Sequence, residues 1–199
     1  MSNITFKQYR NIDLFIFAAL LLVSETITTY ATNTWFDKQP VAISVTLTFI
    51  CIVMMRWGAP ALISALLGGL VLCIASNAST NLYVIYLIGN CMSMLSLIWF
   101  KIFKKDDIRK SPLKLFIFVA STYLFMQIGR WVVSLFFGGG LATILTYLGT
   151  DIISLLFATV VMFLMRNLDG MIEDQKAYLF RIQREKEKER EESFPDETI

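Results

Sequence analysis

Two apolar runs of membrane-spanning length, residues 113–137 and 141–165, are joined by three glycines at 138–140. Because a helix needs about 20 apolar residues to cross a bilayer, this pair predicts a transmembrane hairpin. Each run carries one charged residue well inside its ends, Arg130 in the first and Asp151 in the second. A charge within the hydrocarbon is costly unless it faces a partner or a wet cavity, so both are candidate functional residues.

Four more apolar runs precede this hairpin, at residues 12–31, 41–55, 61–76 and 82–100. Apolar residues make up 56% of the chain and charged residues 17%, a balance typical of membrane proteins and far from the soluble average. The sequence therefore predicts an all-α polytopic membrane protein, built as a bundle of six transmembrane helices.

Basic residues gather in alternate segments between these runs, which predicts the orientation. Of 18 Lys and Arg residues, only Lys38 and Arg130 fall outside that alternation. Since Lys and Arg favour cytoplasmic loops, we expect both termini on the cytoplasmic side. The composition becomes polar after residue 166, so we expect a transmembrane substrate-binding domain at 1–166 and a charged, helical cytoplasmic tail at 167–199.

With this orientation, the polar and aromatic residues of the apolar runs fall in the outward-facing half of the bundle, and the inward-facing half is nearly featureless. Ligand pockets combine apolar and aromatic walls with a few convergent polar groups. We therefore expect an outward-facing pocket for a small solute. Its candidate residues are Glu25, Trp35, Tyr83, Tyr86, Asn90, Gln127, Arg130, Trp131, Tyr147 and Asp151.

Roles for these side chains follow from their chemistry. Arg130 offers a two-pronged donor for a carboxylate or phosphate, and the aromatic rings can stack on a flat ligand. Asn90, Gln127 and Asp151 can hydrogen-bond to ring heteroatoms, and Glu25 can accept from an amine or pair with Arg130. Alternatively, Arg130 pairs with Asp151 or Glu25 and fixes the bundle, which is compatible with a ligand site nearby.

Small residues recur every fourth position at Ala61, Ala65 and Gly69. Such faces let helix backbones approach closely. The pattern has two interpretations, ordinary packing inside the bundle or a docking surface for another subunit.

Several classes of site have little support. The chain has no His, and Cys51, Cys73 and Cys91 lie singly in apolar runs without metal-ligand spacing. We expect no metal site, no cofactor and no catalytic residues. The basic residues form no single stripe, so we expect no nucleic-acid partner.

Six spans with both ends inside, a one-sided outer pocket and the segment RNLDGMIEDQKAYL at 166–179 resemble the substrate-binding S component of energy-coupling factor (ECF) vitamin transporters. The resemblance implies capture of a water-soluble vitamin or related metabolite at the bacterial plasma membrane. It also implies two kinds of partner, a transmembrane scaffold subunit and two cytoplasmic ATPase subunits. The chain departs from the family in one respect, because Leu22 and Val23 follow Ala18 and Ala19 where many members have Ala-x-x-x-Ala.

Other functions remain open on the sequence alone. Glu25, Arg130 and Asp151 are compatible with a proton relay in a stand-alone ion-coupled secondary transporter or channel, although no inverted repeat is evident. Two carboxylates are also compatible with an intramembrane enzyme. A scaffold or regulatory protein that acts through its charged tail is the remaining alternative.

Overall fold

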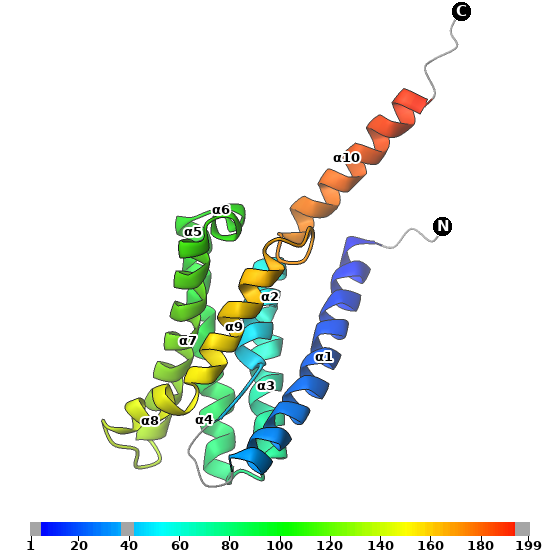
Figure 1. Ribbon diagram of the computed structural model, residues 1–199. Coiled ribbons are helices and arrows are strands. Elements are labelled where there is room, and N and C mark those ends of the chain that lie inside the picture. The colour runs from blue at the N-terminus through cyan, green and yellow to red at the C-terminus, as the bar shows by residue number, and fades with distance from the viewer. Residues whose placement is uncertain (1–4, 37–41, 194–199) are drawn as a thin grey trace, which may run out of the picture.

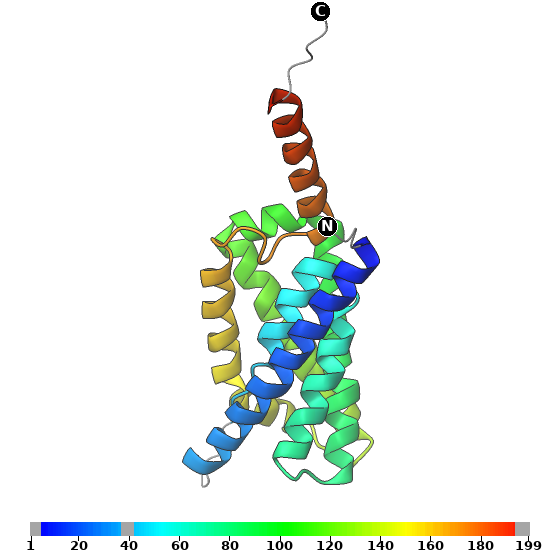
Figure 2. The same ribbon diagram turned by 90° about the vertical axis from the view of Figure 1, so that its right-hand side faces the viewer.

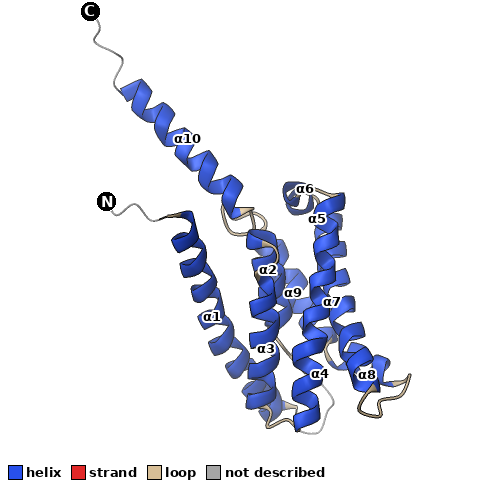
Figure 3. Cartoon of the chain, turned by 180° about the vertical axis from the view of Figure 1, so that it is seen from behind, coloured by secondary structure: helices blue, strands red, loops and turns tan. Residues whose placement is uncertain are grey.

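The computed structural model describes residues 5–36 and 42–193, and every secondary-structure element in these ranges is a helix (Figure 3). This confirms the all-α prediction. Lys38, the predicted start of the second span at residue 41 and the end of the tail at 194–199 lie outside the described residues. The elements are α1 (Phe6–Trp35), α2 (Thr46–Trp57), α3 (Ala61–Ala75), α4 (Thr80–Cys91), η1 (Met92–Ile98), α5 (Trp99–Ile102), α6 (Lys105–Lys110), α7 (Pro112–Leu135), α8 (Thr143–Thr150), α9 (Ile152–Met165) and α10 (Gln175–Ser193).

Three helical segments of the described chain are long and apolar enough to cross a membrane: α1, the continuous run α4–η1–α5, and α7. A fourth is present if α8 and α9 are counted as one span, although they meet at an angle of 44°. The helices α2 and α3 are apolar but only 12 and 15 residues long. These helices are those of a membrane protein.

Local sequence explains where several helices begin. Thr5 and Gln8 form a capping box at the start of α1, in which each side chain bonds to the other residue's backbone N–H. Ser111 caps α7, and Pro112 occupies its first position, where no hydrogen-bond donor is needed. Gly58, with a φ of +75°, ends α2 and turns the chain into α3.

The second span begins later than its apolar run suggests. Residues 42–45 are not helical, and α2 starts at Thr46. The backbone N–H of Ala42 donates to the carbonyl of Thr150 at 2.9 Å, and the N–H of Ser44 donates to Oγ of Ser154 at 2.8 Å. Residues of α8 and α9 therefore accept hydrogen bonds from backbone N–H groups of residues 42–45, which would bond within the helix if α2 began earlier. We refer to residues 42–45 as the strap.

The sixth apolar run, which the sequence predicts as a transmembrane span, is interrupted at Asp151. The chain breaks there into α8 and α9, with φ −98° and ψ 8° at Asp151. Tyr123 of α7 donates its hydroxyl to the carbonyl of Leu148 at 2.6 Å and so satisfies one of the backbone groups near the break.

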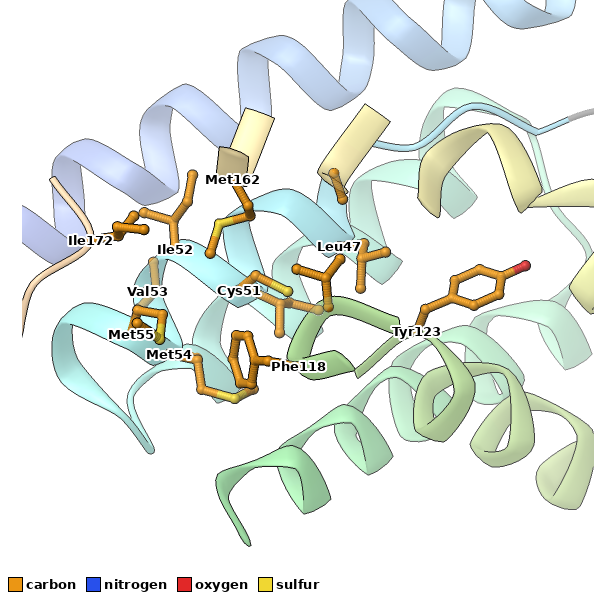
Figure 4. Close-up of a cluster of buried hydrophobic side chains, with 14 of the residues drawn as sticks. Leu47, Cys51, Ile52, Val53, Met54, Met55, Phe118, Tyr123, Met162 and Ile172 are labelled. Carbon is orange, nitrogen blue, oxygen red and sulfur yellow. The ribbon is translucent and has the colours of Figure 1, made fainter. Parts of the chain in front are cut away.

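The apolar core gathers around α2 (Figure 4). Almost every residue of α2 is buried between its neighbours α1, α3, α7 and α9. Figure 1 shows α10 projecting from the end of the bundle where α1 begins, with α8 at the opposite end. Figure 2 shows the same projection from the side, with α1 lying across the front of the bundle. We call these two ends the α10 end and the α8 end.

A polar cluster at the α10 end fixes the start of the tail. Arg56 donates to both carboxylate oxygens of Asp13, at 2.9 Å from Nε and 2.7 Å from Nη2. Its Nη1 donates to the carbonyls of Gly170 and Met171 at 2.6 and 2.8 Å. Trp57 donates its indole N–H to Asp13 at 2.6 Å. One arginine therefore ties α1, α2 and the tail together.

Ion pairs hold the next residues of the tail against α6. Glu173 is buried and pairs with Arg109 and with Arg181. Asp174 accepts from Nζ of Lys105 at 2.7 Å. The segment that leads into α10 is thus attached to the bundle at two points, through Glu173 and Asp174.

Candidate functional site

Three buried polar side chains surround Arg130, which is itself 1% exposed. Its Nε donates to Oδ1 of Asn90 at 2.8 Å, and its Nη1 donates to Oε1 of Gln127 at 3.2 Å and to Oδ2 of Asp151. Gln127 also donates from Nε2 to the same Asp151 oxygen at 3.1 Å. The network joins α4, α7 and the break between α8 and α9.

Two glycines allow this contact between α4 and α7. A Cβ at Gly89 would lie 2.6 Å from the backbone N and Cα of Arg130, and a Cβ at Gly129 would lie 2.6 Å from Cβ of Met92. Larger residues would push the helices apart, since backbones approach closely only where side chains are small. The crossing at Gly89 thereby brings Asn90 within reach of the guanidinium.

Aromatic rings cover the network on its α8 side. The guanidinium carbon of Arg130 lies 4.3 Å from the centre of the Tyr86 ring, a cation–π contact. The Tyr86 ring in turn meets the Tyr147 ring edge-on, with centroids 6.4 Å apart. Tyr86 therefore separates the charged network from the space above it.

That space is a cavity of about 130 Å³ toward the α8 end, bounded by α1, the strap, α3 and α4. Its wall includes both hydroxyl and apolar side chains. Among the lining residues are Thr29, Thr32, Ile43, Leu72, Cys73 and Tyr86. The outer cavity, as we call it, thus has Tyr86 in its wall, with Arg130 behind the ring.

No protein-family model, curated protein or solved structure matches this chain. Within the described residues, no group of three His, Cys, Asp or Glu side chains is placed to hold a metal ion.

Glu25 lies apart from the Arg130 network, although the sequence grouped them. Its Oε2 accepts the backbone N–H groups of Val45 and Thr46, at 2.9 and 3.0 Å. These are orphan donors at the start of α2, where the N-cap residue Val45 provides no side-chain cap and Oγ of Ser44 accepts from the N–H of Thr46 at 3.2 Å. Glu25 of α1 therefore caps a neighbouring helix, and the carboxylate that pairs with Arg130 is Asp151.

The remaining predicted residues are placed around or outside this centre. Trp131 donates its indole N–H to the carbonyl of Gly140 at 3.3 Å, in the turn before α8. Trp35 is 77% exposed at the end of α1 and does not join the network. Tyr83 is half-buried one turn before Tyr86.

The small-residue face of α3 is packed inside the bundle. Ala61 and Ala65 are fully buried, and a Cβ on Gly69 would lie 3.0 Å from the carbonyl oxygen of Tyr86. Asn90 donates to the carbonyl of Ala65 at 3.3 Å. Of the two interpretations, ordinary packing inside the bundle describes where these residues lie.

Sequence reasoning missed the strap, whose Ala42 and Ser44 bond to Thr150 and Ser154. No local signal marks this segment, because its partners lie far away in the sequence. It also missed the ion pair of Asp13 and Arg56, for which a signal was present. Asp13 is a charged residue within the first apolar run, and the same property made Glu25 a candidate functional residue.

A larger hollow of about 550 Å³ lies at the α10 end, between the start of α1 and the first turns of α10. Phe6, Tyr9, Leu179 and Phe180 are among its lining residues. Its wall is mostly apolar, and the Arg130 network lies far along the bundle from it. The outer cavity is therefore the stronger candidate for solute binding.

Proposed function

We propose that this chain is the membrane-embedded substrate-capture subunit of an ECF-type importer, which binds a small water-soluble vitamin or related metabolite. The observation that carries the proposal is the outer cavity, whose Tyr86 is backed by the buried Arg130 network. A site of this kind combines an aromatic surface with fixed polar groups, as small-molecule pockets do.

The distribution of polarity along the bundle supports this assignment. Buried polar side chains such as Asn90, Gln127 and Asp151 lie toward the α8 end, and the polar cluster around Arg56 lies at the α10 end. The apolar cluster around α2 lies between them. A continuous polar path would favour a channel, and this apolar cluster interrupts it. The arrangement suits capture from one side.

In this proposal the chain makes six passes, with α2, α3 and the bent pair α8–α9 completing the set. The α8 end faces outward and the α10 end faces the cytoplasm, in keeping with the positions of the basic residues. The charged helix α10 then reaches into the cytoplasm, where the two ATPase subunits would lie. The exposed apolar face of α1, which includes Phe15, Val23 and Ile27, is left for lipid or the scaffold subunit.

The size of the cavity adds a requirement. Pockets for drug-sized ligands measure about 300–1,000 Å³, and the outer cavity measures about 130 Å³. A vitamin-sized solute therefore needs the strap to move outward, which breaks the hydrogen bonds of Ala42 and Ser44 with Thr150 and Ser154. Binding and opening of the strap are coupled in this proposal.

Purification from native membranes tests the proposal. The wild-type protein should carry a small solute detectable by mass spectrometry, and it should co-purify with a scaffold subunit and an ATPase pair. Leu72→Trp fills the outer cavity and should lose the solute while keeping the partners. Leu70→Trp, two positions away on the exposed side of α3, is the matched control and should keep both.

Two results would contradict the proposal. One is recovery of the wild-type protein without ATPase partners. The other is a solute that both tryptophan variants retain equally, since the outer cavity would then not be its site.

A further inference from the structure

Three buried oxygen atoms, one of them on a residue that lines the outer cavity, have no hydrogen-bond partner among the described residues. They are Oε1 of Glu25, Oγ1 of Thr29 and Oγ1 of Thr46. The three residues are 0%, 5% and 1% exposed, so water does not satisfy these atoms from the surface. A buried polar atom without a partner costs about 1–3 kcal/mol, and more if it is charged.

The contacts of these residues place them together. Thr29 follows Glu25 by one helical turn on the buried face of α1, and Thr46 donates its N–H to Glu25 at 3.0 Å. On its other side, Thr46 fills the space that the missing Cβ of Gly68 leaves in α3. Thr29 also lines the outer cavity, which gives the group a route to the outside.

An ionised Glu25 makes the balance of charge around these oxygens negative. Arg130 is already paired with Asp151, and Glu25 forms no ion pair with any described residue. The start of α2 contributes roughly half a positive charge near Glu25. That leaves a buried carboxylate only partly compensated, with one of its oxygens free.

We propose that Glu25, Thr29 and Thr46 form a site for one monovalent cation, either a sodium ion or the ammonium group of a solute. Carboxylate and hydroxyl oxygens are the ligands that hard cations take, and a divalent ion would call for more carboxylate charge than Glu25 supplies. The inference does not depend on the importer role, because it follows from the unpartnered oxygens and the charge balance alone.

Thermal unfolding of the purified protein in nanodiscs tests this site. The unfolding midpoint is titrated with sodium chloride or methylammonium chloride, with N-methylglucamine chloride holding the ionic strength constant. We expect a saturable rise in the unfolding midpoint with either sodium or methylammonium. A response to sodium identifies a free ion, and a stronger response to methylammonium identifies an ammonium group.

Three variants test whether the shift in the unfolding midpoint arises at this site. Thr29→Val removes one hydroxyl and leaves the cap on α2 in place, so it should weaken the apparent cation affinity roughly tenfold without unfolding the protein. Glu25→Gln should abolish the response. Asp169→Asn changes a carboxylate that is 88% exposed and should respond like the wild type.

Two outcomes would overturn the inference. In the first, neither cation shifts the midpoint, and only acidification does, which means that a proton occupies Glu25. In the second, the Thr29→Val variant responds to both cations like the wild-type protein. Both outcomes can be read without knowing whether ATPase partners bind, so they are separate from the test of the importer role.

Discussion

Replacing Asp151 with asparagine should destabilise the bundle by leaving Arg130 buried without a carboxylate. The two side chains are 1% and 3% exposed, so water cannot take the place of the lost partner. Removing one partner of a buried ion pair costs about 3–5 kcal/mol. Since Asn90 and Gln127 still accept from the guanidinium, we expect the lower end of that range, about 3 kcal/mol.

The measurement is the free energy of unfolding in mixed micelles with increasing dodecyl sulfate, followed by circular dichroism. Arg130→Met should cost a similar amount, because it leaves Asp151 unpaired. The double variant should be more stable than the sum of the two single effects predicts, by about 2 kcal/mol. Asp169→Asn, which changes an exposed carboxylate, should shift the free energy by less than about 0.5 kcal/mol.

The reasoning fails if Asp151→Asn costs less than about 1 kcal/mol, because a buried pair cannot be broken so cheaply. It also fails if the two single effects simply add. In that case the arginine and the carboxylate would be stabilised independently, and the network would not be a unit.

Three further predictions concern other parts of the bundle. Gly89→Ala should lower the free energy of unfolding by about 1–3 kcal/mol, because the new Cβ would lie 2.6 Å from the backbone of α7. Gly149→Ala is the control in the same unfolding assay. A Cβ there has no atom within 4 Å, so this substitution should be neutral or stabilising. Arg56→Lys loses the two-pronged contact and should free the start of α10, seen as faster hydrogen exchange there. Burial raises the pKa of Asp174, but Lys105 outweighs it and leaves that pKa below its ordinary value. This pair therefore stabilises the fold above the pKa of Asp174 in the unfolded chain, and its effect is lost as the pH falls through the pKa of Asp174 in the folded chain. A spin label on α10 should become mobile on acidification. In the Asp174→Asn variant, the label should be mobile already at neutral pH.

The sequence could predict the Arg130 network in part, because the cost of burying charge restricts where such residues lie. Gln127 and Arg130 are three residues apart on α7, so they share a face, and they are in contact in the structure. Asp151 was one of two alternatives for the partner of Arg130. Its choice over Glu25 depends on which helices are neighbours, which hydrophobic periodicity does not specify.

The position of Glu25 depends on where α2 begins, and the apolar run gave no sign of it. The run from residue 41 contains the β-branched residues Ile43, Val45 and Thr46, which suit both extended and helical backbone. Hydrogen bonds from α8 and α9 to the strap decide between the two. Such contacts join residues more than a hundred positions apart, so no local pattern predicts them.

The attachment of the tail by Arg56 makes α10 a lever on the bundle. Its 19 residues extend about 28 Å at 1.5 Å per residue. If the base stays fixed, tilting the bundle by about ten degrees carries the far tip through about 5 Å. A protein bound to α10 would therefore detect a change in the tilt of the bundle in the bilayer, without contacting any of its membrane-spanning helices.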